Sequence, residues 1–180
     1  WQEALTSYPD TEAASWAADR LLDAAVQVDS YDVAQAYAAA GRAAEALPWF
    51  DAALVEITPT AAMRYATAAA HAAAWDLDGA LVQLDALVLA DPSDAQPLLE
   101  QARYLGEYGS ISQALGIYRL VGERFPQSWA AGEAHWQAGR LLEDQGHVEE
   151  AVAEYTALLD ELPAHDRAGT ARFRAGLLRY

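Results

Sequence analysis

Short blocks of apolar and polar residues alternate along the whole chain and predict helices throughout. Within each block, apolar side chains return at spacings of three and four residues, which places them on one face of a helix. Alanine, the strongest helix former, is abundant, whereas the β-branched runs typical of strands are missing. The pattern predicts an all-α protein with helices at 1–8, 11–27, 30–40, 43–57, 61–73, 77–90, 95–108, 111–124, 129–145, 148–161 and 166–180.

The pattern repeats at a nearly constant interval. Pro92 and Pro126 are 34 residues apart, and Pro126 and Pro163 are 37 apart. Each unit is predicted to hold two helices joined by a turn. The first helix carries a small residue, and the second opens with alanine, followed by a bulky residue and a further apolar one. Unit by unit these four residues are Ala34, Ala46, Phe50 and Ala53; Ala68, Ala80, Leu84 and Leu87; Ala102, Ala114, Tyr118 and Val121; Gly139, Ala151, Tyr155 and Leu158.

The recurring residue types have a packing explanation. Small side chains let two antiparallel helices approach closely, and the bulky residue packs against the next pair. One helix pair cannot bury both of its faces, so neighbouring pairs are needed for stability.

These residues resemble the tetratricopeptide repeat, whose helix-turn-helix unit spans 34 residues. The resemblance implies a right-handed superhelical solenoid of antiparallel helix pairs, with about four to five repeats in a single domain over residues 1–180. His71 departs from the pattern because it stands where Tyr37 stands one unit earlier. Pro48 departs as well, because a proline inside the second helix is expected to kink that helix or delay its start. The predicted repeats are 27–59, 61–94, 95–128 and 132–165, with partial units at 1–28 and 166–180.

The register of the first 40 residues stays open. Trp1, Leu5 and Pro9 match the closing half of a second helix, while residues 11–28 and 30–40 both read as first helices. Either a second helix is lost, or the helix at 30–40 takes that part, or the register is wrong.

Two finer resemblances concern origin. Units that begin with Phe125-Pro126 or Tyr8-Pro9 are similar to those of bacterial envelope tetratricopeptide proteins, and favour the periplasm or cell envelope over the cytoplasm. The segment 167–177 is similar to the helical superhelix region of soluble lytic transglycosylases. Because the chain starts at Trp1, we expect a segment of a larger protein with adjoining domains at both ends.

Composition narrows the function classes. Lysine is absent, and 27 acidic residues against 11 arginines give a net charge of −16, which argues against nucleic-acid partners. The 53% hydrophobic content favours a folded chain, and no run of apolar residues is long enough for a membrane span. Without cysteine there are no disulfides, thiolate metal sites or cysteine nucleophiles.

No motif predicts catalysis, a metal site or a cofactor. There is no glycine-rich phosphate loop with a lysine, no His-Glu-x-x-His pair and no Gly-x-Ser-x-Gly elbow. His71 is expected to pack in the core or line the groove. The acids after His147 are explained by the dipole at a helix start. The acidic residues from Glu143 to Glu154 read as a solvated helix face rather than a carboxylate pair for glycoside cleavage.

Candidate binding residues come from the register of the first helices, which line the concave side of such solenoids. A ladder of large side chains suits peptide recognition, although the same side chains also fill space between adjacent helices. The next positions are small or apolar in the N-terminal half and charged in the C-terminal half. The ladder is Tyr31, Tyr65, Leu99, Trp136 and Phe173, and the neighbouring candidates are Gln35, Arg103 and Arg140.

Together these features predict a non-enzymatic scaffold, part of a larger bacterial protein, that binds a protein or peptide in its groove. The alternative is the non-catalytic helical arm of a peptidoglycan lytic transglycosylase, whose catalytic glutamate would lie in another domain.

Overall fold

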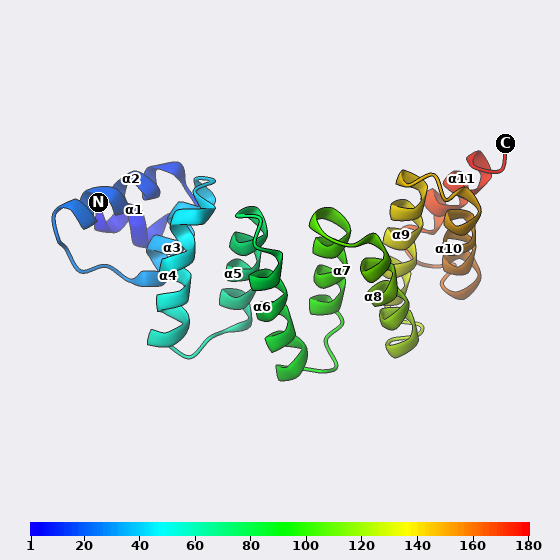
Figure 1. Cartoon of the computed structure of the whole chain (residues 1–180), viewed down its shortest axis with the longest axis horizontal. Coiled ribbons are helices and arrows are strands. Elements are labelled where there is room, and N and C mark those ends of the chain that lie inside the picture. The colour runs from blue at the N-terminus through cyan, green and yellow to red at the C-terminus, as the bar shows by residue number, and fades with distance from the viewer. The chain divides into compact units, whose positions relative to one another are not determined.

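All 180 residues are described in a computed structural model, which contains eleven α-helices and no strands (Figure 1). The predicted helix positions are confirmed, and most ends agree within two residues. The helices are α1 (Gln2–Ser7), α2 (Glu12–Asp23), α3 (Ser30–Ala39), α4 (Ala43–Glu56), α5 (Ala61–Ala73), α6 (Leu77–Ala90), α7 (Gln96–Tyr108), α8 (Ile111–Arg124), α9 (Trp129–Asp144), α10 (Val148–Glu161) and α11 (Ala168–Leu177).

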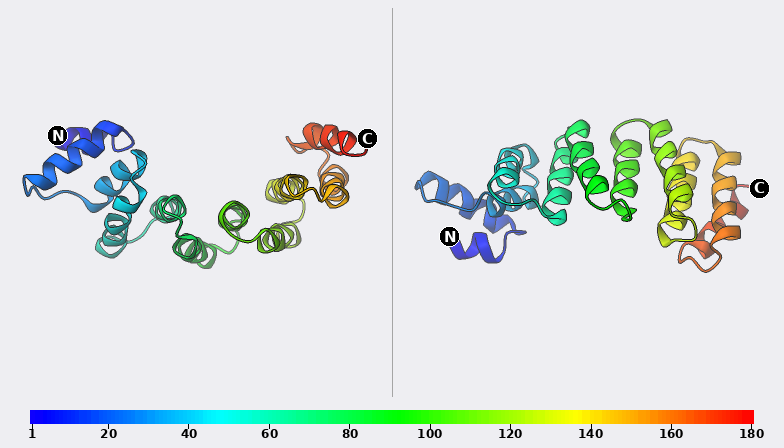
Figure 2. Two further views of the ribbon diagram at one scale, coloured as in Figure 1. Left: turned by 45° about the horizontal axis from the view of Figure 1, so that its top comes forward. Right: turned by 90° about the horizontal axis from the view of Figure 1, so that it is seen from below.

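The chain divides into two compact units, unit 1 over Trp1–Leu87 and unit 2 over Val88–Tyr180. In unit 1, α3 packs most extensively against α4, and α4 packs against α5. In unit 2, α7 packs against α8, α8 against α9, α9 against α10 and α10 against α11. Figure 2 shows the neighbouring helices of each pair running in opposite directions. Each unit is thus a stack of antiparallel helix pairs.

Buried side chains follow the repeat pattern. Ala34, Ala68 and Ala102 are fully buried, and so are the alanines that open the second helices. The bulky residues Phe50, Leu84, Tyr118 and Tyr155 are at most 5% exposed. Small residues therefore lie where first and second helices meet, as the packing explanation requires.

Gly139 is required by a close approach of two helices. A Cβ atom at this position would lie 2.5 Å from Cε1 of Tyr155. The ring of Tyr155 thus occupies the space that the methyl group of an alanine at position 139 would need.

The turn between α5 and α6 holds an unusual backbone conformation. Trp75 has φ of 63°, in the left-handed region where Gly41 (φ 74°) and Gly146 (φ 76°) lie in the equivalent turns. The amide of Asp76 donates to the carbonyl of His71 across this turn, at 2.9 Å. Left-handed backbone is unfavourable for a bulky L-residue, so this turn is held against a local conformational cost.

The open question of the N-terminal register is answered by the contacts of α2. It packs against both α1 and α3, and α1 also touches α3. This is the relation of a second helix to the first helices on either side of it, so the assignment of residues 11–28 as a first helix is wrong. Ala14, Ala18 and Leu21 have the spacing of the second-helix pattern and are buried. The pattern was hard to recognise because alanine replaces the bulky residue at position 18.

Pro48 lies inside α4 without delaying its start. The helix begins at Ala43 and continues to Glu56. Helix starts elsewhere are capped by side chains: Thr11, Asp29, Thr60 and Ser128 each accept a hydrogen bond from a backbone amide of the first turn.

Candidate binding clefts

Unit 1 contains a cavity of about 390 Å³ along α3 and α5, which we call the apolar cleft. Most of its wall consists of methyl groups. Alanine side chains end at Cβ, so two alanine-rich helix faces leave a hollow between them. The lining residues are Asp10, Gln35, Ala38, Ala39, Gly41, Ala43, Phe50, Ala66, Ala69, Ala70 and Ala73.

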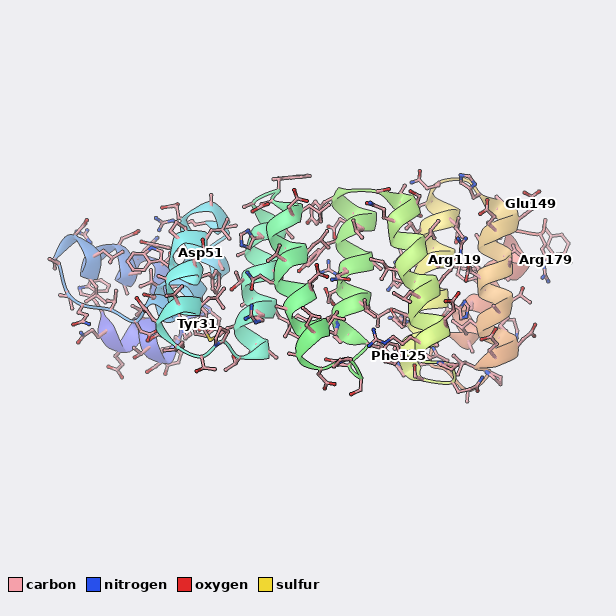
Figure 3. All side chains as sticks on the ribbon, turned by 60° about the horizontal axis from the view of Figure 1, so that its bottom comes forward. Tyr31, Asp51, Arg119, Phe125, Glu149 and Arg179 are labelled. Atoms are coloured by element: carbon pink, nitrogen blue, oxygen red, sulfur yellow. The ribbon has the colours of Figure 1, made fainter.

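The phenyl ring of Phe50 contributes to this cleft and is itself held by Tyr31. The two rings meet edge to face with centroids 6.0 Å apart. Tyr31 lies on α3 (Figure 3) and is half-buried. Its burial raises the pKa of the phenol above its ordinary value.

Unit 2 contains two adjoining cavities of about 110 and 260 Å³ along α7 and α9, which together we call the charged cleft. Both are lined by Arg103, Tyr118 and Gln137. The smaller cavity is also lined by Gln96, Leu99, Glu100, Trp129 and Glu133, and the larger one by Gly106, Glu107, Arg140, Leu141 and Asp144.

A hydrogen-bond network fixes the side chains of the charged cleft. The guanidinium of Arg103 donates to Glu100 at 2.7 Å and to Glu107 at 3.2 Å. The amide nitrogen of Gln96 donates to Glu100 at 3.1 Å, and that of Gln137 donates to Glu133 at 2.6 Å. The donors in this cleft are therefore largely engaged with its own carboxylates.

Glu133 is the most enclosed acid of the charged cleft. The residue is 9% exposed, and its Oε2 atom accepts no hydrogen bond. The nearest cation is Arg167, whose Nε atom lies 3.5 Å away, too long for a strong hydrogen bond. Tyr118, which lines both cavities, is 5% exposed. Its burial raises the pKa of the phenol to about 12.

The predicted ladder is distributed unevenly. Tyr31 and Tyr65 are half-buried, Leu99 and Trp136 are 7% and 5% exposed, and Phe173 is 69% exposed. Leu99 lines the charged cleft, and the other four lie outside the linings of both clefts.

Trp136 has the contacts of a core residue. Its ring packs against Tyr155, with centroids 5.6 Å apart. The guanidinium carbons of Arg167 and Arg174 lie 5.6 and 5.9 Å from its ring centroid. This burial favours the space-filling explanation for Trp136.

The three polar candidates do line clefts. Gln35 belongs to the apolar cleft, and Arg103 and Arg140 belong to the charged cleft. The small and apolar character expected for the N-terminal half and the charged character expected for the C-terminal half are both present in these linings. Whether these residues bind a ligand stays a prediction.

His135 lines a further cavity, outside the two clefts, that sequence reasoning missed. It measures about 290 Å³ and is lined by residues of α8, α9 and α10, including Arg119 and Glu123. The imidazole Nδ1 lies 2.8 Å from Glu154, and Nε2 lies 3.7 Å from Glu161. The hydrogen bond with Glu154 raises the pKa of His135 above its usual value of 6.5.

A signal for this contact exists in the repeat register. Arg64 donates to Gln83 at 2.9 Å between α5 and α6. His135 and Glu154 hold the same two positions two repeats later. In these two helix pairs the register therefore brings the same two positions into contact.

The other histidines satisfy local contacts. The side chain of His71 is 12% exposed and lies 2.7 Å from the Asp76 carboxylate at the turn after α5. His147 precedes α10 and lies 3.0 Å from Glu150. No three histidine or acidic side chains gather in a geometry that would hold a metal ion. No helix has the length and apolar character needed to cross a bilayer.

Comparisons with known proteins identify the architecture. No family model and no curated protein matches the chain. Among solved structures, the chain is similar to the crystal structure of YrrB, described as a tetratricopeptide-repeat protein with an unusual peptide-binding site. The match has a TM-score of 0.54 and 23% identity, and covers 96% of this chain and 88% of YrrB. At this identity the likeness concerns the fold, and the comparisons do not favour the lytic transglycosylase arm. The chain therefore has a tetratricopeptide-repeat fold.

Proposed function

We propose that this chain is a non-catalytic scaffold that binds peptide segments of partner proteins in the clefts between its first helices. The observation that carries the proposal is the presence of the apolar cleft along α3 and α5 and the charged cleft along α7 and α9. Each cleft is bordered by first helices, which line the binding face of such repeats. Recognition needs apolar surface together with a few positioned polar groups, and the two clefts offer these in different proportions.

The fold relationship supports the same proposal. YrrB is described as having a peptide-binding site, and the two chains share their helical architecture over most of their length. The catalytic alternatives lack a comparable observation. The contacts of the serines and histidines do not bring together a nucleophile, a base and an oxyanion donor. A scaffold that binds peptides needs no such cluster.

The test is a selection of random peptides displayed on phage against the immobilised full chain. Peptides should be enriched over the bare support. Synthetic versions should then bind the wild-type chain and lose at least about tenfold in affinity for a variant with one cleft filled, since a blocked pocket removes its anchor. Ala69→Arg fills the apolar cleft, and Gln96→Arg blocks the charged cleft.

Ala44→Arg is the matched control because Ala44 is exposed on α4 and lines neither cleft. It adds the same charge to the same unit as Ala69→Arg and should leave binding unchanged. The proposal fails if no peptide is enriched, or if every selected peptide binds the two blocked variants as well as it binds the wild-type chain.

A further inference from the structure

We infer that the smaller cavity of the charged cleft binds the guanidinium group of an arginine side chain supplied by a peptide partner. The inference rests on the proposed function and names the chemistry of the ligand at one of its clefts. It is carried by the excess of carboxylates over cations in the lining of this cavity, by the buried carboxylate of Glu133 and by an exposed tryptophan in the same lining.

The carboxylates of the cavity already engage part of its donors, and acceptors remain beside them. One N–H group of each side-chain amide, of Gln96 and of Gln137, donates to Glu100 and Glu133 respectively, and the carbonyl oxygens of both amides are able to accept. The guanidinium of Arg103 is engaged by Glu100 and Glu107. A ligand group made only of donors, such as a guanidinium, would complement these acceptors.

Glu133 supplies a charge that its own surroundings balance poorly. Its Oε1 atom accepts from Gln137, while Oε2 accepts no hydrogen bond although the residue is nine-tenths buried. An enclosed carboxylate without a donor is unfavourable. The Nε atom of Arg167 lies 3.5 Å from Oε2, and this side chain is 46% exposed, so it balances the charge only in part. A ligand cation that enters beside Glu133 would improve the balance.

Trp129 adds an aromatic surface. It lines the smaller cavity, is 56% exposed, and is held by a stacking contact with His165 at 5.9 Å between centroids. A planar guanidinium can stack on an indole while its N–H groups reach carboxylates, which an ammonium does less well. The volume of about 110 Å³ suits the head of one side chain.

The charge of the whole chain acts in the same direction. Its net charge of −16 attracts cationic segments and repels acidic ones. Glu100 and Glu133 against Arg103 leave the lining of the smaller cavity negative.

The experiment is an NMR titration of the ¹⁵N-labelled full chain with N-acetyl-arginine methylamide. The control ligand is N-acetyl-citrulline methylamide, which has nearly the same shape without the charge. We expect the largest shifts at the Trp129 indole N–H and at the side-chain amides of Gln96 and Gln137. The citrulline compound should bind at least about tenfold more weakly, since a charge-assisted pair is lost. Equal binding of the two compounds, or shifts confined to other parts of the chain, would overturn the inference.

Variants separate this cavity from general attraction to an acidic protein. Glu133→Gln keeps the shape and should weaken binding of the arginine compound at least about tenfold. Glu149→Gln removes the same charge from an exposed position at the start of α10 (Figure 3) and should change binding by less than about twofold. Equal losses in both variants contradict the inference.

Arg167→Gln is a second variant that remains informative if Glu133→Gln does not fold. Removal of the competing guanidinium should strengthen binding, and unchanged or weaker binding would contradict the inference. The peptide selection distinguishes the two proposals. Selected peptides that ignore this cavity refute the inference alone, whereas arginine binding here without any selected peptide refutes the proposed function alone.

Discussion

The apolar cleft of unit 1 and the charged cleft of unit 2 are built on the same helix-pair geometry but have opposite chemistry. In unit 1, alanines and Phe50 line the space along α3 and α5, with Gln35 as one of two polar side chains. In unit 2, the corresponding space along α7 and α9 is lined by arginines, acids and glutamines, and Arg103 and both glutamines donate to its carboxylates. Buried positions thus set the repeat backbone, while a few outward positions of the first helices set the chemistry of the cleft between them.

The interiors of the two units also differ in how they fill space. At the ladder positions unit 1 has the half-buried Tyr31 and Tyr65, whereas unit 2 buries Trp136, and unit 2 needs Gly139 where unit 1 has alanine. Variants at matched positions test whether these are two solutions to one packing problem.

The largest effect is expected at the ladder position. Trp136→Ala should lower the free energy of unfolding by about 3–5 kcal/mol, because the ring is almost fully buried against Tyr155. Tyr31→Ala should cost less than half as much, since Tyr31 is half-buried. Urea unfolding of the full chain, followed by circular dichroism, measures both. A larger cost for Tyr31→Ala would contradict the difference between the units.

A smaller effect is expected where first and second helices touch. Gly139→Ala should destabilise the chain by about 1–3 kcal/mol, because the new methyl group meets the ring of Tyr155. Gly116→Ala is the control, since a Cβ there would meet nothing within 4 Å. It should stabilise the chain by about 0.5–1 kcal/mol through helix propensity alone. Thermal melts give both signs, and stabilisation by Gly139→Ala would show that the two helices can separate freely.

The smallest effects depend on pH, and this dependence runs in opposite directions in the two units. In unit 1, hydrogen bonds from Arg42 lower the pKa of Asp19 below 3.8. A lowered pKa contributes stability that is present above the unfolded value and is lost as pH falls through the folded value. Asp19→Asn should therefore reduce stability most near neutral pH, and the difference from wild type should shrink in acid.

In unit 2, the raised pKa of His135 acts at the other end of the pH range. Its contribution is present below the ordinary value of 6.5 and is lost as pH rises through the folded value. His135→Gln should lower stability by about 1 kcal/mol near pH 6 and by less in alkaline solution. His147→Gln, at an exposed histidine, is the control. Urea midpoints between pH 3 and 9 measure these differences, and a His135→Gln penalty that grows with pH would refute this account.

The helices and the buried residues were predictable because each depends on spacing within one helix or one repeat. Ala34, Phe50 and their equivalents are fixed by local periodicity, and all are buried. The N-terminal register was not predictable in the same way. It depends on which neighbours α2 touches, and the alanine at position 18 removes the bulky residue that marks a second helix elsewhere.

The candidate binding residues were predicted in part. The repeat register alone identified Gln35, Arg103 and Arg140 as candidates, and all three line a cleft. The burial of Trp136 depends on Tyr155 of α10, Arg174 of α11 and Arg167 just before α11, all distant from it in the sequence. The enclosed carboxylate of Glu133 depends likewise on the distance to Arg167, which no spacing in the sequence gives.

The contact between Arg64 and Gln83, and its counterpart between His135 and Glu154, have a consequence for how repeats evolve. The same two repeat positions are in contact in both helix pairs. Arg64 and Gln83 keep a constant charge, whereas His135 can gain or lose a proton. Exchanging these two pairs of residues between the repeats would move the pH-dependent contact from one helix pair to another without changing the backbone. Evolution can thus add or remove a pH-dependent contact in a single repeat without altering the others.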